Sequence, residues 1–133
     1  MSDEASAYFA PVCRLVMGLQ CWSRTVWRDG DAREYGPWGT LLIVPTSGYL
    51  ESSAGPVLLR KIEWVDVSTK KVSGGLRGLP LKMTDHRGAI LAKLGETAIP
   101  WELRESTWSH ARFFDEQPVE VIRIANPYGP VVA

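Results

Sequence analysis

The sequence has few of the residues from which metal centres and nucleophilic sites are built. Its 133 residues include two cysteines and two histidines. Cys13 and Cys21 are eight residues apart, and His86 and His110 lie far from both, so no zinc-ligand spacing is present. A Gly-Lys-Ser/Thr phosphate loop, a Gly-x-Gly-x-x-Gly segment and a Gly-x-Ser-x-Gly elbow are absent too. We therefore expect no metal ion and no cofactor.

An excess of one charge is also missing. Fifteen basic and fifteen acidic side chains give a formal net charge of zero, so nothing attracts nucleic acid or an anionic membrane over long range. No apolar run approaches the roughly 18 residues of a membrane helix, and residues 1–4 are acidic where a signal peptide is basic. The chain is expected to be cytoplasmic and not to bind membranes.

The two cysteines are expected to be reduced and buried. Eight residues of helix separate two positions by about 12 Å, whereas a disulfide needs Cα atoms within about 7 Å. Free, buried thiols agree with a reducing compartment.

Hydrophobic periodicity predicts two helices. Apolar residues at 12, 15, 16 and 19 share one helical face, which indicates a helix from about residue 5 or 11 to 20. Pro11 then lies in its first turn or kinks a longer helix that begins after Ser2. A second helix is predicted after Thr84, as N-cap, with Gly95 at its end.

Apolar runs bounded by turn residues predict five strands. These are 21–28, 38–44, 57–67, 99–103 and 119–125, of which 57–67 is expected to be the longest. Residues 70–80, with three glycines, are expected to form a mobile loop. Glu63 and Asp66, three apart on a strand, are expected on opposite faces unless the strand is bulged, which disfavours a paired-carboxylate mechanism.

The order of these elements predicts the fold class. Links between the early strands are too short or irregular for parallel crossovers, so the fold is expected to be α+β. We predict a single globular domain, 1–133, with an antiparallel sheet of about five strands and one or two helices packed on one face. An open antiparallel sheet has edge strands with unpaired backbone groups, so a homodimer formed through an edge strand is a further possibility.

Aromatic and acidic residues are the main candidates for a binding surface. Six tryptophans are many for this length, and a small core does not hide them all. At protein interfaces, large rings anchor the complex while charges set orientation and association rate. Carboxylates also imitate phosphates, which suits a partner that is a basic nuclease. The residues predicted to contact a protein partner are Asp29, Asp31, Glu34, Trp38, Trp108, Asp115 and Glu116.

Part of the chain resembles a class of small uncharacterised bacterial proteins, several of which are suspected immunity factors. The resemblance rests on Trp38, Pro45, Tyr49-Leu50-Glu51, Gly55-Pro56, Ile62-Glu63-Trp64-Val65 and Ile122-Arg123-Ile124. It brings no catalytic positions with it. It implies that the protein binds and blocks a toxin made by the same cell, and we expect a non-enzymatic inhibitor of this type.

Two alternatives come from other segments. The basic glycine-rich loop 70–82, with Lys70, Lys71, Arg77 and Lys82, suggests a small-molecule or nucleic-acid binding domain, although zero net charge makes nucleic acid the weaker ligand. The third hypothesis is a small enzyme centred on His110, with Glu102, Glu105 or Asp115 as its acidic partner.

Overall fold

The structure is a computed structural model that describes residues 3–74, 77–110 and 114–130, with the backbone alone at residues 3, 74 and 110. Its helices are α1 (Asp3–Leu19) and α2 (Arg87–Leu94), and a 3-10 turn, η1, covers Leu59–Lys61. The strands are β1 (Ser23–Asp29), β2 (Ala32–Tyr35), β3 (Leu42–Thr46), β4 (Tyr49–Ser52), β5 (Gly55–Leu58), β6 (Ile62–Ser68), β7 (Lys70–Gly74), β8 (Leu81–Asp85), β9 (Glu102–His110) and β10 (Phe114–Ala125).

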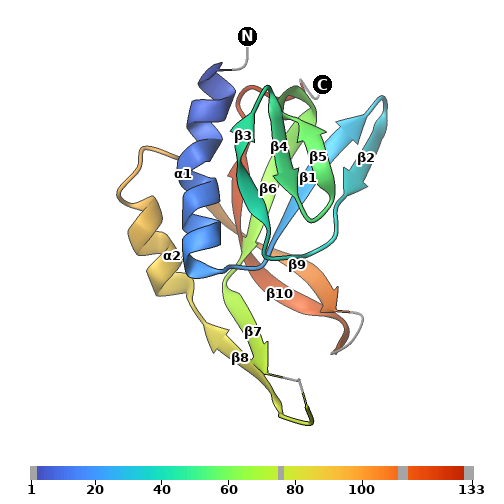
Figure 1. Ribbon diagram of the computed structural model, residues 1–133, viewed down its shortest axis with the longest axis vertical. Helices are drawn as coiled ribbons and strands as arrows, with labels where there is room; N and C mark the ends of the chain where they lie inside the picture. Colours follow the sequence, from blue (N-terminus) through green and yellow to red (C-terminus); the bar gives the residue numbers. More distant parts are fainter. Residues whose placement is uncertain (1–2, 75–76, 111–113, 131–133) are drawn as a thin grey trace.

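Five of these strands form the central antiparallel sheet, in the order β2-β1-β6-β10-β9. Both helices lie on one side of it (Figure 1). The smaller sheets are β3-β4-β5 and β7-β8. The α+β class, with an antiparallel sheet of five strands and helices on one face, is therefore confirmed.

The main core lies between the helices and this sheet, because each element turns an apolar face inward. Its fully buried members include Phe9, Val12 and Val16 of α1, Ile90 of α2, Val65 and Val67 of β6, and Ile122 of β10. Both cysteines are free and buried in it, as predicted.

Helix α1 follows the longer of its two predicted courses and carries Pro11 in its interior. Pro11 donates no hydrogen bond to the carbonyl group of Ala7, one turn earlier. Ala7 is exposed, so solvent can hydrate that carbonyl group. No helix in the described residues is both long and apolar enough to span a membrane.

The prediction of one long strand at 57–67 is wrong. The 3-10 turn at Leu59–Lys61 separates β5 from β6, so the segment serves two different sheets, and β10 is the longest strand. Leu59 is fully buried in the main core, which the turn allows. A run of apolar residues indicates burial without showing where the chain changes direction.

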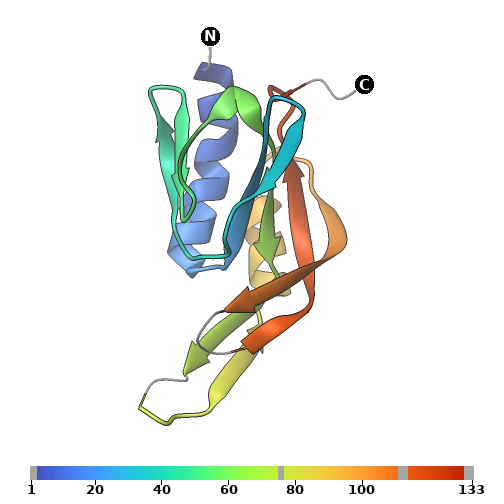
Figure 2. The same cartoon turned by 90° about the vertical axis from the view of Figure 1, so that its right-hand side faces the viewer.

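Residues 70–80 also differ from the predicted loop. Lys70–Gly74 pairs with Leu81–Asp85 as a hairpin, which extends away from the body of the molecule (Figure 2). Thr84 therefore lies in β8 instead of capping α2, and the Asp85 carboxylate accepts a hydrogen bond from the Arg87 N–H at 2.9 Å. Gly74 is the last residue of β7 and Gly78 has a positive φ in the turn, so these glycines mark the turn of a hairpin.

Two other strands begin later than predicted. The strand expected at 38–44 is β3, and Pro45 lies inside it, which is tolerated because β3 is an edge strand with a register shift there. The strand expected at 99–103 begins at Glu102 and runs on to His110. The predicted strands 21–28 and 119–125 correspond to β1 and to the second half of β10.

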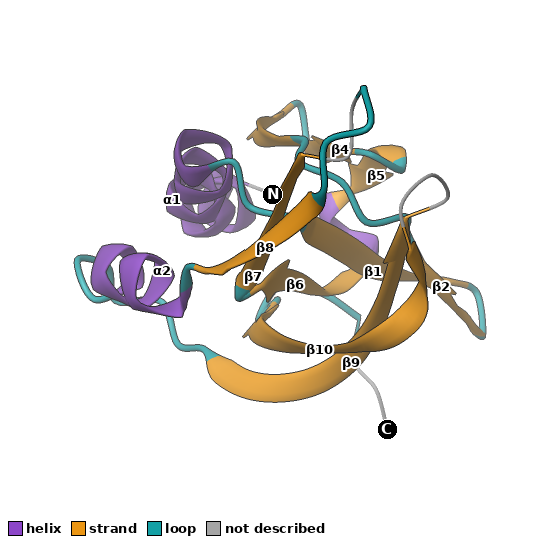
Figure 3. Ribbon diagram, turned by 90° about the horizontal axis from the view of Figure 1, so that it is seen from below, coloured by secondary structure: helices purple, strands orange, loops and turns teal. Residues whose placement is uncertain are grey.

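The central sheet is strongly curled about the face that turns away from the helices. In a flat sheet, β1 and β9 would be about 14 Å apart, three strand spacings. Instead, Arg24 of β1 donates a hydrogen bond to the Ser106 hydroxyl of β9 at 2.7 Å, and the Trp38 indole N–H reaches the Thr107 carbonyl at 3.0 Å. Figure 3 shows this curl from below. We call the enclosed side the concave face.

Candidate functional site on the two faces of the central sheet

The predicted acidic contacts fall at two opposite ends of the sheet. Asp29 and Asp31 lie at the β1–β2 turn, whereas Asp115 and Glu116 lie at the start of β10, at the other end of the strands. At the first end Asp29 pairs with Lys61 at 3.3 Å, and arginines of β1 and β2 surround the turn. Glu34 is exposed on β2, opposite Trp27. The structure does not bring these acids together into one surface.

The two tryptophans predicted as anchors lie at one end of the concave face. Trp108 is 3% exposed and packs in a second hydrophobic cluster with Val72, Val119 and Val121. The half-buried Trp38 meets the Trp108 ring edge-on at 6.2 Å between centroids. In this fold the Trp108 ring supports its aromatic neighbours and offers little surface to a partner.

The basic residues of the alternative ligand site lie on the β7–β8 hairpin and in its turn. Lys70 pairs with Asp85 at 2.9 Å, and Lys71 donates to the Leu19 carbonyl at 3.5 Å. Arg77 and Lys82 are exposed. Two of the four cations are thus held within the protein, and ligand binding by this hairpin stays a prediction.

The predicted enzyme site is centred on His110. The His110 side chain lies outside the described residues. Glu102, Glu105 and Asp115 are exposed, and Glu102 pairs with Arg104 at 3.0 Å. Within the described residues, no group of three or more His, Cys, Asp or Glu side chains is placed to hold a metal ion. Burial raises the pKa of Cys13 to about 12 and that of Cys21 to about 11, so both stay protonated thiols at neutral pH.

The middle of the concave face is a network of arginines, carboxylates and aromatic rings. Asp66, which is fully buried, accepts two hydrogen bonds from the Arg123 guanidinium at 2.8 and 3.2 Å and one from the Trp64 indole at 3.2 Å. Arg123 also lies over the Trp64 ring, 4.2 Å from its centroid. The Arg33 guanidinium lies 4.8 Å from the same centroid and makes two hydrogen bonds to Glu63.

A β-bulge explains how Glu63 and Asp66 can both pair with guanidinium groups that lie over the Trp64 ring. The pairing of β1 with β6 skips Glu63, which becomes the extra residue of the bulge. The expected strict alternation between Glu63 and Asp66 is therefore broken at this point. Hydrogen bonds from Arg33 are the main reason why the pKa of Glu63 is lowered from its ordinary value.

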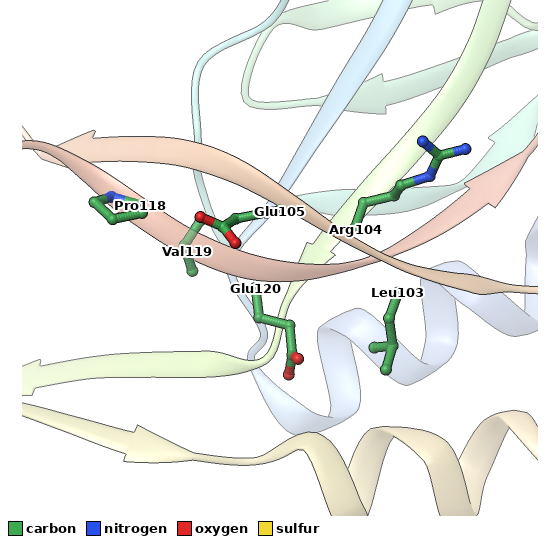
Figure 4. A pocket seen from close by; sticks show the side chains of 6 residues that line it. All are labelled: Leu103, Arg104, Glu105, Pro118, Val119 and Glu120. Atoms are coloured by element: carbon green, nitrogen blue, oxygen red, sulfur yellow. The ribbon is translucent and has the colours of Figure 1, made fainter.

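The opposite face of the β9–β10 hairpin carries an open pocket of about 330 Å³, lined by Leu103, Arg104, Glu105, Pro118, Val119 and Glu120 (Figure 4). Leu103 and Glu105 are two residues apart on β9, which places their side chains on the same side of the strand. Glu105 lies directly opposite Glu120 of β10. Trp101 continues the same spacing just before β9 and is 41% exposed, and Leu103 is 43% exposed.

The two glutamates of this surface differ in their partners. Glu120 is joined to Arg87 of α2 at 3.3 Å, with 38% of its side chain exposed. Glu105 is exposed and has no ion pair within the described part of the chain. We call Trp101, Leu103, Glu105 and Glu120 the β9 outer surface.

Sequence reasoning named only Glu105 from this surface, and in another role. The alternation Trp101, Leu103, Glu105 was a readable signal for a strand with one exposed apolar and acidic side. Its pairing with Glu120 depends on the register of two strands, which local sequence does not specify. Comparisons with family models, curated protein sequences and solved structures find no match to this chain.

Proposed function

We propose that this chain is a non-enzymatic binding protein that uses the β9 outer surface to hold a partner protein through a cationic side chain flanked by apolar groups. The supporting observation is the pair of carboxylates, Glu105 and Glu120, directly opposite each other on neighbouring strands. Like charges at such positions repel, and Arg87 offsets only one of them. An arginine or lysine of a partner, placed between the two, relieves that repulsion.

The apolar part of the surface supports a protein partner over a free cation. Leu103, which lines the pocket together with both carboxylates, and Trp101, two residues before it, are exposed large apolar side chains. A large ring next to charged groups is typical of the few residues that dominate binding energy at an interface. Strand β9 is also an edge of the central sheet, so part of its backbone is open to further pairing.

The inhibitor type predicted from the sequence is part of this proposal. An enzyme that binds an anionic substrate presents cations in its active site, and adjacent carboxylates can occupy them as substrate phosphates do. An immunity-type protein would act in this way on a toxin of its own cell. A cytoplasmic location belongs to the same proposal, and the two free, buried cysteines agree with it.

The test compares partner capture by the tagged wild-type chain with capture by a Trp101→Ala/Glu105→Gln variant, in extracts of the native host. The matched control is Tyr49→Ala/Glu51→Gln on β4, because Tyr49 is 44% exposed and Glu51 is an exposed glutamate two residues away. We expect one stoichiometric protein to be retained by the wild type and the control and lost by the β9 variant. Its own activity should be blocked by the purified chain.

Three outcomes would overturn the proposal. The first is recovery of the tagged chain alone after a moderate-salt wash. The second is a captured protein that the β9 variant retains as well as the wild type does. The third is self-association, seen as a dimer by sedimentation that Trp101→Ala/Glu105→Gln dissociates, which would make a second copy of the chain the occupant of this surface.

A further inference from the structure

Arg24 differs from the other arginines of the concave face in having no carboxylate partner. Arg123 is paired with Asp66, and Arg28 and Arg33 are paired with Glu63. Among the described residues, no carboxylate lies within 4.0 Å of the Arg24 guanidinium. The Arg24 guanidinium donates a hydrogen bond to a neutral hydroxyl, that of Ser106.

The surroundings of Arg24 restrict how anything can approach it. Its guanidinium carbon lies 5.0 Å from the centroid of the Tyr35 ring and 4.8 Å from that of Trp38. Aromatic rings over a guanidinium leave its edge as the route for an acceptor. Tyr35 is 53% exposed, which makes its side of the concave face the way in from solvent.

The hydrogen-bonding capacity of Arg24 is largely unused. A guanidinium has five N–H donors, yet the buried Nε of Arg24 has no acceptor among the described residues. Such a donor, removed from water and left without a partner, is costly. Burial is also the main reason why the pKa of Arg24 is lowered, an effect that the charges of Asp66 and Glu116 oppose from a distance.

We propose that Arg24 binds a ligand in which a carboxylate is attached to a flat apolar group. The two carboxylate oxygens accept hydrogen bonds from Nε and Nη2 of Arg24 and replace the Ser106 hydroxyl as acceptor. The planar fork of a guanidinium matches a carboxylate in two hydrogen bonds. A carboxylate is chosen over phosphate because Arg24 itself has one positive charge without a carboxylate partner in the described part of the chain, and because the Tyr35 and Trp38 rings beside it suit a flat apolar group. This site is on the other side of the sheet from the β9 outer surface and does not depend on the proposed function.

The test uses benzoate as the probe and benzamide as its neutral counterpart, with binding followed through the NMR signals of the Trp38 indole N–H and the Arg24 Nε–H. We expect saturable shifts of both signals with benzoate and none with benzamide. Arg24→Lys should weaken benzoate binding by about tenfold or more, because lysine keeps the charge but loses the fork. Arg14→Lys, at an exposed position of α1, should leave it unchanged.

Further arms separate the sources of the carboxylate. A tripeptide ending in phenylalanine, with a free or an amidated C-terminus, shows whether a peptide terminus is accepted as well as a free acid. Tighter binding of inorganic phosphate than of benzoate would overturn the choice of carboxylate. Equal shifts with benzamide, or benzoate binding that Arg24→Lys leaves intact, would overturn the site itself. The wild-type titration alone decides this if the variant does not fold.

Discussion

Replacing Asp66 with asparagine should destabilise the protein more than any change to a surface ion pair. Asp66 is fully buried and accepts hydrogen bonds from Arg123 and Trp64. Asparagine keeps the size of the side chain but removes its negative charge. Arg123, whose side chain is only 19% exposed, would then carry a positive charge without its ion-pair partner.

The expected loss follows from that uncompensated charge. Removing one partner of a buried ion pair typically costs about 3–5 kcal/mol. Partial exposure of Arg123 lets water offset some of its charge, so we expect the free energy of unfolding to fall by about 3 kcal/mol at pH 7. A small domain has about 5–15 kcal/mol in total, so the variant should still fold but unfold at clearly lower denaturant.

Urea unfolding followed by tryptophan fluorescence measures this difference. The matched control is Glu102→Gln, which breaks the Arg104–Glu102 pair, where each side chain is about half exposed. Exposed pairs contribute about 0–1 kcal/mol, so the control should change little. The double variant Asp66→Asn/Arg123→Met should recover part of the lost stability, because it removes both charges and leaves none unpaired.

A loss of less than about 1 kcal/mol for Asp66→Asn would refute this reasoning, since it would place the buried pair with ordinary surface pairs. A double variant as unstable as the sum of its two single variants would refute the coupling between Asp66 and Arg123. Either result would mean that the side chains of the network in the concave face contribute to stability independently of one another.

Two further predictions concern the bulge and a crowded glycine. The pKa of Glu63 is lowered in the folded protein, chiefly by hydrogen bonds from Arg33. Glu63 therefore stabilises the fold fully above its unfolded pKa of about 4.5, and this stabilisation is lost as the pH falls through the lower folded pKa. Urea unfolding at pH 7 and pH 3 should show a smaller stability difference for Glu63→Gln than for the wild type, and an unchanged difference would contradict this. Gly129→Ala should lower the free energy of unfolding in urea by about 1–3 kcal/mol, because the added Cβ would clash with the Ile62 carbonyl oxygen. Gly18→Ala in α1, where the added Cβ has open space, should raise it by about 0.5–1 kcal/mol. Equal effects of the two variants would contradict the crowding at Gly129.

Local sequence was sufficient for several elements and for the fold class. The apolar spacing in α1 and the turn after β1 are properties of neighbouring residues, so they can be read without knowing the rest of the chain. The same holds for the buried, free state of the two cysteines. Where the pairing of two segments decides the structure, as between residues 70–74 and 81–85, the prediction was wrong.

The sites depended on relations that local sequence does not contain. Arg24 and Ser106 are 82 residues apart and meet only because the sheet curls, while Glu105 and Glu120 face each other through the register of β9 and β10. The bulge at Glu63, which changes which side chains are neighbours, is likewise set by strand pairing. The sequence by itself determined which segments are apolar, and hence the helices, most strands and the α+β class, because burial follows local periodicity. Only the tertiary structure decided which charges are paired and which stay without a partner, because that depends on distances between residues far apart in the chain.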